Sequence, residues 1–335
     1  MMLHPGILAL LLGSAISFFL VFYASILGLI IMTHWDFTSS SEGQLLLERK
    51  TYLISTIVGM VLGFTLFSGL LFLYTIDDIH SLFVGAMCGT GTLNANPIGW
   101  LVLLSKGIIF FCASLWVIFN HLDQHCEDAP LVRYKYGALL ILALLLGADL
   151  VLQSYFFSGL HPEKITSCCG SLFGSGSATV AGELAAFPPG RTMWIFYGAA
   201  CCYLLSILLC LISHSWLLRI LLLIESLLLL PISLTSVISF ISLYIYQMPS
   251  HHCPFDMIQK NYYFIGYPLY MGLFGGILFG LVPGLCLLLR NTASLNREIE
   301  KREKRWLIQA FLFFSIFLTI STWPILFGKF QLFAY

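Results

Sequence analysis

Eight long apolar runs dominate this chain of 335 residues and leave little choice of fold. A helix needs roughly 20 mostly apolar residues to cross the hydrocarbon layer of a membrane. Backbone polar groups must also bond internally in lipid, which favours helices. We therefore predict an all-α, polytopic transmembrane bundle of about eight spans. The runs cover residues 6–33, 51–75, 99–120, 136–159, 191–213, 216–246, 264–289 and 306–328.

The overall composition agrees with a membrane protein. Hydrophobic residues make up 59% of the chain and charged residues only 10%, whereas soluble domains carry about 25% charged residues. The net charge is zero, which gives no support to a nucleic-acid partner. No glycine-rich phosphate loop is present, so no nucleotide partner is expected. We predict a single integral membrane domain over residues 1–335, with membrane lipid as its surroundings.

Lysine and arginine predict the orientation, because they concentrate in cytoplasmic loops. Of the 16 such residues, 11 fall in one set of alternate loops, four fall in the other set and its flanks, and Lys106 lies inside a span. Both termini should then face outward, with outward loops at 76–98, 160–190 and 247–263. A bacterial cytoplasmic membrane is the expected setting. The larger group comprises Arg49, Lys50, Arg133, Lys135, Arg219, Arg290, Arg297, Lys301, Arg302, Lys304 and Arg305.

Two local features modify the simple picture of eight straight spans. Pro231 lies inside the long sixth run, where a proline predicts a kink. The charged segment 296–306 precedes the last run, and its composition predicts a helix at the membrane interface.

The ten cysteines divide by their predicted location. Five lie within spans, where cysteine packs as a small apolar residue, and Cys126 is on the predicted cytosolic side. The other four gather in the outward loops, which makes them candidate functional thiols. These four are Cys88, Cys168, Cys169 and Cys253.

Histidines accompany the outward thiols in the last of these loops. Thiolate and imidazole groups together suit soft or borderline metals such as copper or zinc. The candidate metal ligands are Cys88, Cys168, Cys169, His251, His252 and Cys253.

Three interpretations of these residues are open. They form disulfide staples, hold a soft metal, or exchange disulfides with an extracytoplasmic redox or metal-carrier protein. No Cys-x-x-Cys spacing is present to choose among them. The sequence therefore leaves open whether the protein is an enzyme.

Ionisable residues inside predicted spans form a second group of candidates, because such residues are costly in lipid. Lys106 and Asp149 lie on neighbouring spans, at depths of roughly 10–15 Å from the predicted outer boundary. They are expected to pair, and Gln153 lies one turn from Asp149. Either a structural ion pair or a proton path would explain them. Glu225 lies nearer the predicted cytosolic end.

A weak internal repeat is also visible. Cys88 precedes the third span and Cys253 the seventh, which are equivalent positions in two parallel four-span halves. Short similar phrases follow them, NPIGW and YFIGYPLY. The sequence thus allows pseudo-symmetric halves.

The sequence supports two hypotheses about the function of the whole chain. The chain is either a protein with an outward metal or thiol site, or a membrane subunit of a larger transporter or respiratory complex. A two-haem wire across the membrane is disfavoured, because the nine histidines fall at span ends or in loops.

Overall fold

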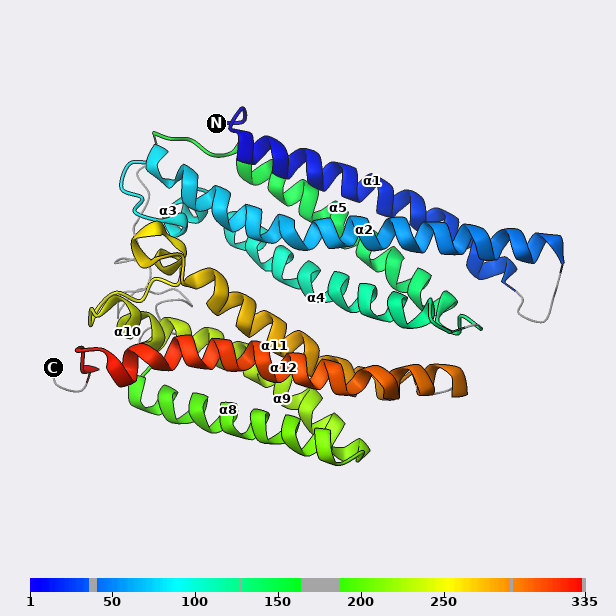
Figure 1. Cartoon of the computed structure of the whole chain (residues 1–335). Coiled ribbons are helices and arrows are strands. Elements are labelled where there is room, and N and C mark those ends of the chain that lie inside the picture. The colour runs from blue at the N-terminus through cyan, green and yellow to red at the C-terminus, as the bar shows by residue number, and fades with distance from the viewer. Residues whose placement is uncertain (36–40, 127, 164–186, 290–291, 333–335) are drawn as a thin grey trace. The chain divides into compact units, whose positions relative to one another are not determined.

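The structure is a computed structural model that describes residues 1–35, 41–126, 128–163, 187–289 and 292–332. Within these ranges the chain is helical and contains no strand (Figure 1). Eight helices are long and apolar enough to cross a membrane. The predicted all-helical, multi-pass architecture is therefore confirmed. Cys168 and Cys169 lie outside the described residues.

The spanning helices follow one another along the chain with short helical segments between them. A short helix, α3, lies between the second and third spanning helices and is buried for most of its length. The elements are α1 (Pro5–His34), α2 (Glu42–Asp78), η1 (Ile79–Leu82), α3 (Gly89–Asn94), α4 (Gly99–Asp123), α5 (Val132–Ser158), α8 (Pro189–Ile212), α9 (Trp216–Ser236), η2 (Val237–Ile241), α10 (Ser242–Tyr246), η3 (Asp256–Ile258), η4 (Lys260–Tyr262), α11 (Gly266–Leu287) and α12 (Ala293–Phe327).

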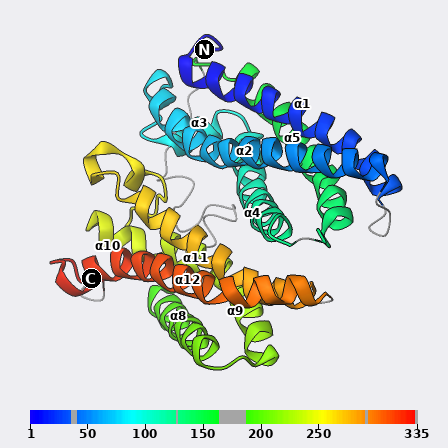
Figure 2. The same cartoon turned by 45° about the vertical axis from the view of Figure 1, so that its right-hand side comes forward.

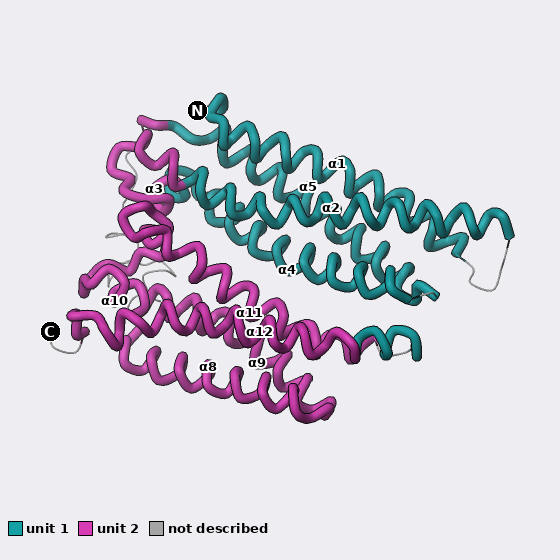
Figure 3. The backbone as a smooth tube through the Cα atoms, in the orientation of Figure 1, with its two compact units in different colours: residues 1–76, 93–161, 290–299 teal, residues 77–92, 162–289, 300–335 magenta. Residues whose placement is uncertain are grey.

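The chain divides into two compact units (Figure 3). Unit 1 comprises residues 1–76, 93–161 and 290–299, and unit 2 comprises residues 77–92, 162–289 and 300–335. The short segment 77–92 therefore belongs to unit 2, although it connects two helices of unit 1. The predicted sequence repeat between halves stays a prediction.

Unit 1 is built around α5, which packs along both α1 and α4 (Figure 2). Its apolar core includes Val21, Leu62, Ile109 and Leu139. A glycine permits the close approach of α1 to α5: a Cβ atom at Gly28 would lie 2.5 Å from Cδ1 of Tyr136. Small residues at such crossings let membrane helices pack closely.

In unit 2, glycines at every fourth position of α11 allow this helix to pack closely against its neighbours. A Cβ atom at Gly272 would lie 2.8 Å from backbone atoms of Phe313 and Phe317 on α12. Further along, Gly280 leaves room for the hydroxyl of Tyr203, which donates to the carbonyl of Gly276 at 2.7 Å. The repeated glycines thus let α11 contact its neighbours directly. They are Gly272, Gly276, Gly280 and Gly284.

Two expectations about local structure are modified. Pro231 lies inside α9, and a single turn of π-helix follows it at Val237–Ile241. The charged segment 296–306 is continuous with the last span in one 35-residue helix, α12, rather than a separate interfacial helix. One reason lies in Glu303, whose buried carboxylate forms an ion pair with Arg219 on α9.

Candidate metal site

Two of the four predicted outward thiols meet in unit 2. The Sγ atoms of Cys88 and Cys253 lie 3.5 Å apart, and both side chains are fully buried. Cys88 immediately precedes α3, and Cys253 lies in the loop that follows α10. The segment 77–92 thus brings a thiol from the first half of the chain to one from the second.

A carboxylate that the sequence analysis missed completes the group. Asp256 begins η3, three residues after Cys253, and its Oδ1 atom accepts a hydrogen bond from the Cys253 thiol at 3.3 Å. One ligand atom each from Cys88, Cys253 and Asp256 lies within 4.8 Å of the other two. We call these three residues the dithiol–carboxylate cluster.

The two neighbouring histidines have different positions. His251 is hydrogen-bonded through Nε2 to Oδ2 of Asp256, so it supports the cluster through the carboxylate. His252 instead donates from Nδ1 to the carbonyl of Ile238, at 2.8 Å. That carbonyl belongs to the π-helical turn, where the regular bonding ladder of the helix is interrupted. Of the two predicted histidine ligands, the structure brings only His251 to the cluster.

A second set of polar contacts holds Cys88 against the loop. Gln259 donates from Nε2 to Oδ1 of Asp77 at 3.0 Å and to the carbonyl of Met87 at 3.1 Å. The backbone N–H of Gly89 donates to the same Asp77 oxygen at 3.2 Å. These bonds fix the residues on both sides of Cys88. Asp77 and Gln259 are therefore positioning residues, and nothing in the sequence pattern alone distinguished them.

The thiol of Cys253 has further polar neighbours. The hydroxyl of Thr90 lies 3.5 Å from its sulfur, and the backbone N–H of Phe255 donates to that sulfur at 3.4 Å. Donors to sulfur stabilise the thiolate form over the neutral thiol. The hydroxyl of Tyr246 donates to the Cys253 carbonyl at 2.6 Å, which fixes the backbone of the same residue.

Electrostatics keep Asp256 ionised. Burial raises the pKa of its carboxyl group, but hydrogen bonds from His251, Cys88 and Cys253 outweigh burial, and the net pKa lies below the ordinary value. Asp256 is therefore a carboxylate at neutral pH. Burial lowers the pKa of His252, which keeps that imidazole neutral.

The sulfur separation shows that Cys88 and Cys253 are not joined by a disulfide bond in this structure. A disulfide bond is about 2.05 Å long, so its formation would need the sulfurs to approach by roughly 1.5 Å. Two thiolates that bind one tetrahedral zinc ion at about 2.3 Å lie about 3.8 Å apart. The observed 3.5 Å is a contact between two thiols, longer than a disulfide bond and shorter than that spacing. Among the described cysteines, no pair lies at disulfide-bonding distance.

The intramembrane candidates lie apart from this cluster in the chain. Nζ of Lys106 is 2.8 Å from Oδ2 of Asp149, and Gln153 donates to the same oxygen at 2.6 Å. All three side chains are buried in unit 1. Glu225, in unit 2, is half-buried and hydrogen-bonded to Ser206.

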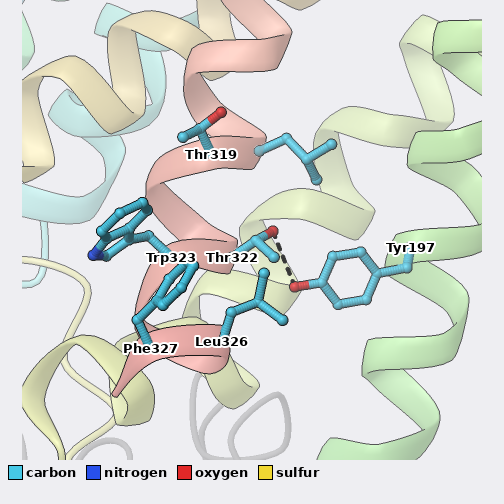
Figure 4. Close-up of a pocket in the computed structure, with 7 residues that line it drawn as sticks. Tyr197, Thr319, Thr322, Trp323, Leu326 and Phe327 are labelled. Atoms are coloured by element: carbon cyan, nitrogen blue, oxygen red, sulfur yellow. Dashed lines mark hydrogen bonds between the residues drawn. The ribbon is translucent and has the colours of Figure 1, made fainter.

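An apolar groove of about 440 Å³ lies between α8 and α12 in unit 2 (Figure 4). Its main polar feature is the pair of hydroxyls of Tyr197 and Thr322, 3.2 Å apart. The remaining lining is mostly aliphatic and aromatic, with Trp323, Leu326 and Phe327. Among the described residues that line it there is no carboxylate, amine, imidazole or thiol.

Comparison with known proteins leaves the cluster to be interpreted by its own geometry. No known protein family matches the chain, and neither a curated protein nor a solved structure is significantly similar to it.

Proposed function

We propose that this integral membrane protein binds a divalent zinc-class metal ion on its extracytoplasmic face, through Cys88, Cys253 and Asp256. The observation that carries the proposal is the meeting of two thiols and a carboxylate, whose ligand atoms lie within 4.8 Å of one another. Three protein ligands that leave one position open are typical of zinc sites that exchange a fourth ligand.

The mixed donor set favours zinc over Cu(I). Thiolates alone suit Cu(I), whereas a carboxylate oxygen is a hard ligand that zinc accepts and Cu(I) does not prefer. With sulfurs 3.5 Å apart, zinc–sulfur bonds of about 2.3 Å would enclose an angle of roughly 100°, near the tetrahedral value. Cys168 and Cys169 remain proposed candidates for the fourth position, which one of them would fill.

The cluster is better suited to metal binding than to thiol exchange. Exchange needs an accessible thiolate, and both sulfurs belong to fully buried residues. A neighbouring carboxylate also repels a developing thiolate, whereas it attracts a metal cation. The side chains of His251 and Asp256 are partly exposed, at 26% and 12%, and offer a route by which an ion reaches the sulfurs. A site open at this edge is suited to taking up metal outside the cell.

Metal analysis of the purified full-length protein tests the proposal. After equilibration with zinc and desalting, the wild type should retain about one zinc per chain, and Cys88→Ser, Cys253→Ser and Asp256→Asn should each retain far less. Cys210→Ser is the matched control, because Cys210 is a buried thiol of α8 far from the cluster in sequence. A Cys168→Ser/Cys169→Ser variant tests the additional ligands.

Two outcomes would reject the metal site. One is a wild type that retains no zinc when its thiols are fully reduced. The other is alkylation and mass analysis in which Cys88 and Cys253 are recovered from cells as one disulfide-linked pair, which would favour the structural staple.

A further inference from the structure

A second polar centre lies inside unit 1, and it does not depend on the metal site. Five polar side chains from three helices meet there: Ser14 of α1, Ser105 and Lys106 of α4, and Asp149 and Gln153 of α5. Asp149 is 1% exposed, Gln153 0% and Lys106 7%. The group is therefore buried, within helices long enough to cross a membrane.

The carboxylate of this group is fully occupied, but its neighbours are not. Asp149 accepts from Ser105 at 2.5 Å, from Lys106 at 2.8 Å and from Gln153 at 2.6 Å. The Oε1 atom of Gln153 is buried and has no hydrogen-bond partner among the described residues. An ammonium group has three N–H donors, and in the described part of the chain that of Lys106 bonds only to Asp149.

An ion pair with a purely structural role is expected to satisfy its own polar neighbours, because each unpaired buried group is costly. Here one acceptor and two donors remain beside the pair. A water molecule would bond to both kinds of group, because water both donates and accepts hydrogen bonds. The side chains thus form a site at which a proton can be received and passed on.

A second buried ion pair lies at the other end of the same two helices. Nζ of Lys135 on α5 is 2.6 Å from Oδ2 of Asp123 on α4, and Asn120 accepts from the same ammonium at 3.3 Å. In this second pair the lysine is on α5 and the aspartate on α4, which is the reverse of the first pair. The 17 residues from Lys106 to Asp123 correspond to about 25 Å of helix, close to the thickness of the hydrocarbon layer.

A buried hydroxyl lies between the two pairs along α4. Ser114 is 5% exposed, and its Oγ atom has no hydrogen-bond partner among the described residues. It lies eight residues from Lys106, or about 12 Å along the helix axis. Ionisable groups near both ends and a hydroxyl between them are the elements of a path for protons.

We propose that unit 1 conducts protons across the membrane, with the Lys106–Asp149 pair and the Lys135–Asp123 pair as its two proton-transfer sites. A proton from water binds the Asp149 carboxylate and neutralises it. Lys106, which has lost its counter-charge, passes its own proton through water to the Asp123 carboxylate of the second pair and becomes a neutral amine. Transfer of the proton from Asp149 to Lys106 restores the ion pair. One proton enters and one leaves, and only O–H and N–H bonds form and break.

The test is proton flux into liposomes that contain the purified full-length protein and a trapped pH-sensitive dye, driven by a potassium diffusion potential. Wild-type liposomes should acidify at least tenfold faster than empty ones. The variant Lys106→Met/Asp149→Leu should lose this flux, since it removes both charges and leaves neither partner unpaired. Arg219→Met/Glu303→Leu removes a buried ion pair from unit 2 and should conduct as the wild type does.

Helical content and melting temperature are measured on every variant, so that a folding defect is recognised. If Lys106→Met/Asp149→Leu fails to fold, Gln153→Leu provides a second test, because it removes the unpartnered acceptor and keeps the ion pair. Wild-type liposomes no more permeable to protons than empty ones would overturn the proposal. Undiminished flux in a folded variant without the Lys106–Asp149 pair would overturn it equally.

Discussion

Cys88 and Cys253 are 165 residues apart in the sequence, yet their sulfur atoms lie 3.5 Å apart in unit 2. The contact exists because the segment 77–92 leaves the helices on either side of it and packs with unit 2. Bonds from Gln259 to Asp77 and to the Met87 carbonyl hold that segment in place. The position of one thiol thus depends on a glutamine that is itself no metal ligand.

Replacement of Gln259 should weaken metal binding without removing a ligand. In Gln259→Ala the segment around Cys88 loses two hydrogen bonds, and loss of such supporting contacts commonly costs about 10–100-fold in metal affinity. Zinc competition with a chromophoric chelator measures the change. Asp78→Asn is the control, because Asp78 is an exposed carboxylate next to Asp77. Equal affinity in Gln259→Ala and wild type would refute the positioning role.

Zinc binding should release protons from the thiols and none from the carboxylate. The pKa of Asp256 is lowered, so this group is already ionised at neutral pH. Metal-bound cysteines are thiolates, and their protons leave on binding. We expect up to two protons per zinc at pH 7, and an affinity that falls as the pH is lowered. Calorimetry in buffers of different ionisation enthalpy counts these protons. At zinc concentrations high enough to load it, the Cys88→Ser variant should release fewer protons per bound zinc.

The pH dependence of stability should contain a contribution from His252. Burial lowers the pKa of this imidazole in the folded protein, so the unfolded chain binds a proton more readily. Stability is then lost as the pH falls below the ordinary histidine pKa of about 6.5. We expect the wild type to melt at a lower temperature at pH 5.5 than at pH 7.5. His252→Gln should show a smaller difference between the two pH values. An unchanged difference would show that His252 contributes nothing.

The spans could be predicted from the sequence because each is a local property of one apolar run. The start of the fifth predicted span, 191, lies two residues from the start of α8 at Pro189. Lys106 and Asp149 were expected to meet because they lie on consecutive antiparallel helices, where depth along the axis fixes which residues face each other.

The dithiol–carboxylate cluster could be predicted only in part, because its contacts are not local. Cys88 and Cys253 were predicted as outward thiols, but their meeting depends on which unit the segment 77–92 joins. Asp256 was overlooked because a single aspartate in a loop carries no distinctive pattern. Only the turn that begins at Asp256 brings its carboxylate to the Cys253 sulfur.

The glycines of α11 provide a test of helix packing in unit 2. A methyl group at Gly272 would meet the backbone of α12 at 2.8 Å, where no side chain can move aside. Overpacking of this kind costs about 1–3 kcal/mol, so Gly272→Ala should lower the melting temperature in detergent. Gly198→Ala on α8 is the matched control, because nothing lies within 4 Å of the added atom. Equal melting temperatures for the two variants would contradict the close packing of α11 on α12.

The charged part of α12 should be essential for the stability of unit 2, because it contains the partner of a buried cation. Arg219 is 3% exposed and forms bonds to both carboxylate oxygens of Glu303. Removal of one partner from a buried ion pair costs about 3–5 kcal/mol, because the other charge stays buried without compensation. Glu303→Gln should therefore melt at a markedly lower temperature than the wild type.

The control for this prediction lies on the same helix. Glu300 is exposed and lies three residues before Glu303. Glu300→Gln therefore changes the net charge by the same amount as Glu303→Gln and should leave the melting temperature nearly unchanged. The double variant Arg219→Met/Glu303→Leu should recover most of the stability lost in Glu303→Gln, since it leaves no unpaired charge. If Glu303→Gln were as stable as Glu300→Gln, the segment would have only the interfacial role that its composition predicts. A loss specific to Glu303 would instead show that its ion pair with Arg219 of α9 stabilises unit 2.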